Sequence, residues 1–208
     1  MKRKNVELLT PVGTARYPHL NEPDRRFNDD GVFACDLILE ANGETEAFME
    51  KLMYEWTEAA DYAKDQAGKA NAKAANPPWA EEEDDEGGMT GRIILKTKLK
   101  HIVRPRNGTP WKKKVHIVDS QKNPMGEKVG PGSQLRLKIA VRGWFMPTNG
   151  AGASLDLIAA QVFELKQGGG AVDGFDVVED GFTSEVAPEA FSDKVDETVT
   201  DASNAGTF

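Results

Sequence analysis

The first 40 residues alternate between short apolar segments and turn residues. Residues 6–17 and 31–39 are rich in apolar and β-branched side chains and are bounded by proline and glycine. Such segments are typical of β-strands. A turn-rich loop, residues 18–30, is expected to connect them.

A helical period replaces this pattern over about residues 44–75. Phe48, Leu52 and Trp56 recur at steps of three to four residues, alanines continue the stripe, and charged side chains occupy the other faces. This spacing predicts an amphipathic helix whose apolar stripe packs on the rest of the fold. The two prolines that follow Asn76 are expected to end it.

The next segment is strongly acidic. Residues 81–88 read EEEDDEGG, and a run of like charges has too little apolar surface to fold. We therefore expect a mobile acidic loop over about residues 79–90.

After this loop, apolar and polar residues alternate with a period of two residues. In residues 92–104 and 133–146 apolar side chains alternate with lysine and arginine, which predicts two strands that each have an apolar and a basic face. The pair Asn107-Gly108 is typical of a hairpin tip, with residues 112–118 as the returning strand. Residues 153–165 predict a last, more apolar strand.

These elements predict a fold that is mainly β with one long helix. Short strands with regular turns and a single helix favour a small barrel over an α/β sheet. We expect an OB-fold, a five- to six-stranded antiparallel Greek-key barrel, over residues 1–167, followed by a disordered acidic tail over residues 168–208. An immunoglobulin-like sandwich is the alternative that the pattern alone leaves open.

The net charge of −8 hides a separation of charges along the chain. Residues 90–147 contain 14 lysines and arginines against two acids, whereas residues 167–208 contain ten acids against one lysine. Such a separation indicates a basic binding body with an acidic appendage.

Composition excludes several classes of site. One cysteine rules out an internal disulfide, and three histidines with that cysteine cannot form the usual closed zinc site, so neither a metal nor a cofactor is expected. Long apolar runs are missing, which predicts a soluble intracellular protein with no membrane partner. Phosphate-binding loops and nucleophile motifs are also missing, which favours a protein that is not an enzyme.

Cations among flat side chains are the means by which proteins hold single-stranded DNA without regard to sequence. The basic strands and the hairpin between them contain both cationic and flat aromatic side chains. The candidate DNA-binding residues are Arg92, Lys96, Lys98, Lys100, Arg104, Arg106, Trp111, Lys112, Lys113, Lys114, Arg136, Lys138, Arg142 and Trp144.

Three side chains, one of them a candidate DNA-binding residue, also have a structural interpretation. Trp144 is as compatible with packing beneath a neighbouring strand as with stacking on a base. His101 falls on an apolar face and is interpreted as a packed core residue, and Cys35 as an inert core thiol.

The tail is acidic and carries four phenylalanines, the last of which is residue 208. It could act only as a solvating tail. A segment in which aromatic residues lie among acidic ones can also bind a basic pocket. It could therefore compete with DNA for the binding site of its own chain, or recruit another protein. The residues proposed for this role are Asp193, Asp196, Glu197, Asp201 and Phe208.

Short motifs in a consistent order resemble the single-stranded DNA-binding proteins of the T-seven-type phage replisome family. The motifs are Gly13-Thr14-Ala15, Pro23-Asp24, Gly31-Val32-Phe33, Asn76-Pro77-Pro78, Val118-Asp119-Ser120, Gly132-Ser133, Gly152-Ala153-Ser154, Phe163-Glu164-Leu165, the triple glycine at 168–170 and the terminal Phe208.

This resemblance implies an OB-fold that binds and anneals single-stranded DNA in phage replication and recombination, in the cytoplasm of the infected bacterial host. It also implies contact with the phage DNA polymerase and helicase-primase through the acidic tail and Phe208, and a possible homodimer. The tail departs from the family pattern, because residues 202–207 lack the dense acidic run before the terminal aromatic.

Two other function classes remain as alternatives. A metal-dependent phage nuclease would need converging carboxylates, for which the candidates are Asp24, Asp29, Asp30, Asp36 and Asp119. A virion or scaffold protein would use the tail only for solubility.

Overall fold

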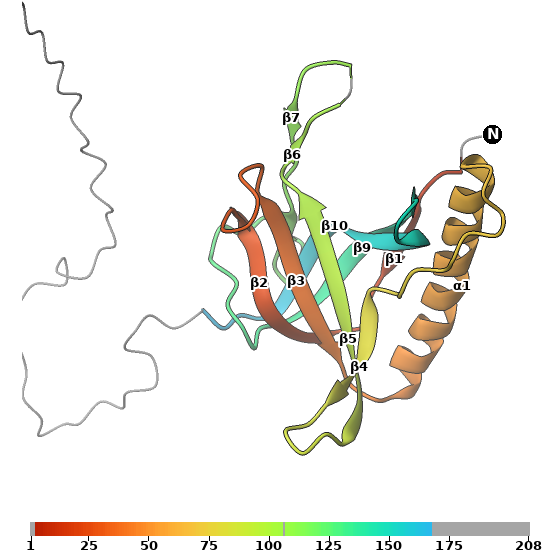
Figure 1. Cartoon of the computed structure of the whole chain (residues 1–208). Helices are drawn as coiled ribbons and strands as arrows, with labels where there is room; N and C mark the ends of the chain where they lie inside the picture. Colours follow the sequence, from red (N-terminus) through yellow and green to blue (C-terminus); the bar gives the residue numbers. More distant parts are fainter. Residues whose placement is uncertain (1–2, 106, 168–208) are drawn as a thin grey trace, which may run out of the picture. The chain divides into compact units, whose positions relative to one another are not determined.

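The computed structural model describes residues 3–105 and 107–167. The predicted tail, with its five proposed interaction residues, lies outside the described residues, as does Arg106. The described part is mainly β with one helix, as the sequence predicts (Figure 1).

Most strands belong to one sheet, whose order is β1-β9-β2-β3-β5-β10-β8, with β4 paired to β5. β9 also pairs with β10, so the pairings β9-β2-β3-β5-β10-β9 return to their start and close the sheet into a barrel. A separate small hairpin consists of β6 and β7. The strands are β1 Val6–Leu9, β2 Gly13–Asp24, β3 Val32–Leu39, β4 Trp79–Glu83, β5 Met89–Lys100, β6 Ile102–Val103, β7 Trp111–Lys112, β8 His116–Val118, β9 Gln134–Met146 and β10 Gly150–Glu164.

The prediction of an entirely antiparallel barrel is wrong at β10. This strand runs antiparallel to β9 but parallel to both β5 and β8. The alternation of apolar and polar residues defines the two faces of a strand but contains no information about the direction of its neighbours.

The N-terminal strands also differ from the prediction. Residues 6–17 form parts of two strands instead of one, because their pairing with β9 is interrupted at residues 10–12, where the Thr10 N–H still donates to the carbonyl of Leu137 (2.9 Å). β2 then continues through the predicted loop as far as Asp24.

Helix α1, Gly43–Gln66, is shorter than the predicted 44–75. The side chain of Asn42 caps its start by accepting from the Thr45 N–H (2.9 Å). Gly68 has a φ of +63°, a left-handed conformation that ends helices. The alanine-rich segment beyond it bonds to the sheet, since the N–H groups of Ala75 and Ala151 donate to the carbonyls of Ala151 and Lys73.

The prediction of a mobile loop over residues 79–90 is wrong, because β4 and the start of β5 form a hairpin there. Trp79 packs against the hydrophobic core and pairs with Leu95. At the tip, Asp84 accepts hydrogen bonds from the N–H groups of Glu86 and Gly88. Backbone pairing and one partly buried indole thus hold an acidic segment that has little apolar surface of its own.

Helix α1 covers one side of the barrel (Figure 1) and packs on β9 and β10. Leu52 of this helix is fully buried, and the Nε1–H of Trp56, one turn further on, donates to the carbonyl of Ala153 (3.0 Å). A Cβ on Gly143 would collide with the carbonyl oxygen of Ala59, so this glycine permits the close approach of helix and strand. Within the described residues no helix has the length and apolar content needed to cross a bilayer.

Candidate nucleic-acid interface

A row of lysines follows the outer face of β5. Lys96, Lys98 and Lys100 are exposed and alternate with the buried Thr97 and Leu99, which confirms the predicted basic face of this strand. The neighbouring positions on β3 are Asp36, Ala34 and Val32. None of the three lysines makes an ion pair with another described residue, so their charges remain available to a ligand.

Two adjacent hollows extend this row across the surface. The first, of about 470 Å³, contains Lys98, Lys100, Lys113 and Arg142. The second, of about 450 Å³, contains Lys112, Lys113 and Lys114. They share Leu99, Lys113 and Asp156, and together we call them the basic groove.

Asp156 is the only acid that lines the basic groove among the described residues. Arg142 donates to both of its carboxylate oxygens, with Nε to Oδ2 at 2.6 Å and Nη2 to Oδ1 at 3.0 Å. Ser154 donates a third hydrogen bond. The hydrogen bond to Asp156 raises the pKa of Arg142, so the guanidinium stays charged. The carboxylate is therefore largely compensated within the protein.

Three of the predicted DNA-binding cations make ion pairs outside the basic groove. Arg92 pairs with Glu82, Lys138 with Glu7, and Arg104 with Asp30. Arg136 instead lies over the ring of Phe163, with its Cζ 5.6 Å from the ring centroid. The structure thus gathers six of the predicted cations in the basic groove and gives these four other cations local partners.

The two candidate tryptophans lie in different environments. Trp111, on β7, is 49% exposed. Trp144 is half-buried on β9, where its ring and that of Trp56 both border Gly152. Trp56 also meets Trp79 edge to face, with ring centroids 5.9 Å apart. Its setting beside Trp56 indicates that Trp144 packs within the fold.

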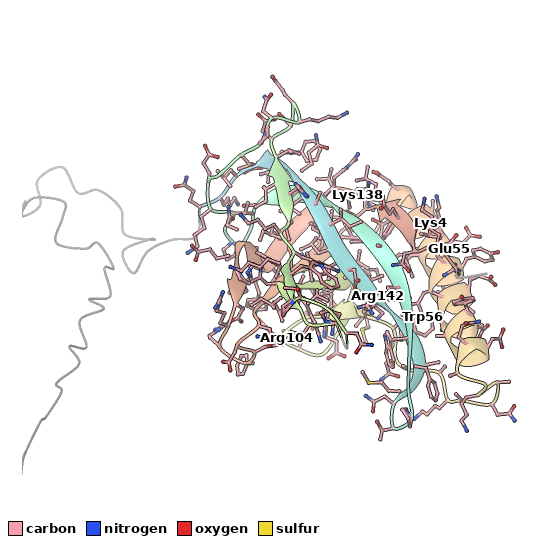
Figure 2. All side chains as sticks on the ribbon, turned by 90° about the horizontal axis from the view of Figure 1, so that it is seen from above. Lys4, Glu55, Trp56, Arg104, Lys138 and Arg142 are labelled. Carbon is pink, nitrogen blue, oxygen red and sulfur yellow. The ribbon has the colours of Figure 1, made fainter. Side chains whose placement is uncertain are left out.

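Arg104 connects the loop between β2 and β3 to the base of the β6–β7 hairpin. Its guanidinium donates to Asp30, with Nη2 to Oδ1 at 2.7 Å and Nε to Oδ1 at 2.9 Å. These hydrogen bonds lower the pKa of Asp30. Backbone bonds from His101 N–H to Gly31 and from Ile102 N–H to Asp30 reinforce the connection. In the view of Figure 2, Arg104 lies on the side of the barrel away from the helix that carries Trp56.

Two residues of this loop were not among those predicted from the sequence. Asn28 lines the basic groove, and its neighbour Phe27 is 91% exposed. The available signal was one aromatic residue in an otherwise polar, turn-rich segment.

The two residues interpreted as core side chains are buried. His101 is 7% exposed, with Nδ1 2.8 Å from the carbonyl oxygen of Lys113 and its ring edge-on to Phe33. Cys35 is fully buried, and this burial raises its pKa to about 12. The core positions expected for both residues are confirmed.

The carboxylates considered for a nuclease mostly have partners of their own. Asp24 pairs with Arg26, Asp36 with Arg16, and Asp30 with Arg104. Asp119 accepts hydrogen bonds from the backbone and side chain of Asn123. Over residues 3–105 and 107–167, no three His, Cys, Asp or Glu side chains are grouped as a metal site requires.

The fold is similar to those of solved phage proteins. No family model and no curated protein matches the sequence. The crystal structure of gp2.5, a single-stranded DNA-binding protein encoded by bacteriophage T7, matches with a TM-score of 0.65 and 20% identity, over 87% of this chain and all of that chain. The single-stranded DNA-binding protein of bacteriophage Enc34, in complex with single-stranded DNA, matches with a TM-score of 0.58 and 10% identity, over 79% and 89%.

At these identities the comparisons establish a shared fold. The resemblance inferred from the short motifs is thereby confirmed at the level of structure: the chain has the fold of phage single-stranded DNA-binding proteins. The OB type of fold expected from the sequence agrees with these neighbours.

Proposed function

We propose that this chain binds single-stranded DNA without regard to sequence, as a non-enzymatic component of phage DNA replication and recombination. The observation that carries the proposal is the basic groove, in which, counting the residues that the structure describes, five lysines and one arginine surround a single, compensated carboxylate. The fold shared with the phage DNA-binding proteins supports it.

The groove matches the chemistry of an unpaired strand. Lysines bind phosphates as mobile point charges, which tolerate any base sequence. Each phosphate neutralised on a single strand contributes about −0.7 to the slope of log K against log salt. Trp111, exposed near Lys112 and Lys113, is available for stacking on a base.

The wider role rests on the charge separation and on the family resemblance. Lysines bound to the phosphates would reduce the repulsion between complementary strands and so favour their annealing. The acidic tail and Phe208 would recruit the phage DNA polymerase and helicase-primase, and would compete with DNA for the basic groove. A homodimer and a location in the cytoplasm of the infected host complete this proposal.

Fluorescence anisotropy with a labelled dT oligomer across a salt series tests the function. The proposal predicts tight binding at low salt, a steep loss of affinity as salt rises, and weaker binding to a duplex of the same length. A virion or scaffold protein would bind weakly with a shallow slope. Loss of the labelled oligomer in the presence of magnesium would instead indicate a nuclease.

A further inference from the structure

Phe27 is an aromatic side chain with almost no protein cover. It lies in the loop between β2 and β3 and is 91% exposed, more than any other large hydrophobic residue described. The guanidinium of Arg26 lies near its ring, 5.8 Å from the centroid. A ring so exposed loses hydrophobic stabilisation that a ligand with a flat apolar face could restore.

Local hydrogen bonds hold the loop that carries this ring. Asp24 accepts from Arg26 through two guanidinium nitrogens, at 3.0 and 2.8 Å. The Asn28 side chain accepts from the Asp30 N–H (3.0 Å), and the Asn28 carbonyl accepts from the Gly31 N–H (2.8 Å). Gly31 has a φ of +72°, which favours glycine. The backbone on both sides of Phe27 is thus tied into defined turns.

This loop is part of the rim of the basic groove. Asn28 lines the groove together with Lys98 and Lys100. The ion pair of Asp30 with Arg104 joins the loop to the base of the β6–β7 hairpin, which carries Trp111. Each of these two exposed aromatic residues is therefore next in sequence to a residue that lines the basic groove, Phe27 to Asn28 and Trp111 to Lys112.

We propose that Phe27 is a stacking site for an unpaired nucleobase of the strand whose phosphates bind Lys98 and Lys100. The inference rests on the proposed function and deepens it, because it assigns part of the preference for unpaired DNA to one residue. In a duplex the faces of the bases are covered by their neighbours, so a protruding ring can stack only on a single strand. The lysines alone would attract either form of DNA.

The test compares the full-length chain with Phe27→Ala, Phe27→Tyr and Phe27→Leu. Affinity is measured for a labelled dT oligomer, for an abasic oligomer of the same length, and for a duplex. Tyr54→Ala is the matched control, because Tyr54 is 64% exposed on the distant helix α1.

We expect Phe27→Ala to weaken binding to the dT oligomer by about 5- to 100-fold, with the same salt slope as the unmodified chain. Binding to the abasic oligomer and to the duplex should change less than twofold. Phe27→Tyr should retain the affinity, Phe27→Leu should lose most of it, and Tyr54→Ala should have no effect.

Two results would overturn the inference: dT affinity that is unchanged in Phe27→Ala, or an equal loss for all three ligands. A loss shared by Phe27→Leu and Phe27→Tyr would also contradict a stacking role. Urea unfolding of each variant shows whether the fold is retained, and the high exposure of Phe27 predicts that it is. Failure of the unmodified chain to bind the dT oligomer would refute the proposed function itself, whereas normal binding with no effect of Phe27→Ala would refute only this inference.

Discussion

Lys98 lies directly opposite Asp156, at the point where β5 runs parallel to β10. The carboxylate is occupied by Arg142 from the other neighbouring strand. The row of lysines thus lies beside the one acid that lines the basic groove within the described part of the chain, and the balance between them should determine how strongly the groove attracts phosphate.

Neutralising Asp156 should strengthen DNA binding. Asp156→Asn removes the negative charge from the groove and releases Arg142 for a phosphate, which should increase affinity by about 1 kcal/mol at low salt and steepen the salt slope by about 0.7. Anisotropy with a dT oligomer measures both quantities. Asp65→Asn, on the exposed face of α1, is the control and should change neither. Weaker binding by Asp156→Asn would show that Asp156 is needed to position Arg142.

Replacement by alanine should affect DNA binding at Trp111 and the stability of the fold at Trp144. Trp111→Ala should weaken dT binding by about 1 to 3 kcal/mol through lost stacking, with little effect on unfolding. Trp144→Ala should lower the free energy of unfolding by about 2 kcal/mol or more, because its ring packs beside Trp56. Urea denaturation and anisotropy on the same samples separate the two effects. Destabilisation by Trp111→Ala would place that residue in the core.

The contact between α1 and β9 leaves no room for a side chain at Gly143. Gly143→Ala should destabilise the fold by about 1 to 3 kcal/mol, since the added methyl group collides with the Ala59 carbonyl. Gly126→Ala is the matched control, because a Cβ there meets no atom within 4 Å. The measurement is the midpoint of urea unfolding. Equal midpoints for the two variants would mean that helix and strand are further apart than described.

The thiol of Cys35 should be inert in the folded protein. Burial raises its pKa to about 12, and only the thiolate reacts readily with disulfide reagents. At pH 8 the folded chain should therefore not react with such a reagent, whereas the urea-unfolded chain should react with one equivalent of it. Rapid reaction of the native protein would contradict the burial of β3.

The sequence predicted those features that depend on local pattern. The alternation of lysine with Leu95, Thr97 and Leu99 located the basic face of β5 correctly, and the stripe through Leu52 identified the face of α1 that is buried. Each of these follows from the geometry of one element, which its own residues specify.

Features that depend on distant segments were not predictable in this way. The parallel pairing of β5 with β10 is a contact between segments far apart in sequence. Residues 67–75 have helical composition, yet Gly68 ends the helix and Ala75 bonds to β10. The acidic residues 81–83 become part of a strand because β5 supplies their partners. The exposure of Phe27 likewise depends on how its loop is folded.

The proposed function depends on binding of the phosphates of an unpaired strand by the lysines of the basic groove. The most direct measurement is the slope of log K against log salt for a dT oligomer with the unmodified chain, with Lys98→Gln and with Lys51→Gln, whose lysine is exposed on α1. We predict that Lys98→Gln makes the slope shallower by about 0.7 while Lys51→Gln leaves it unchanged. Identical slopes for all three proteins would show that Lys98 does not bind a phosphate of the strand.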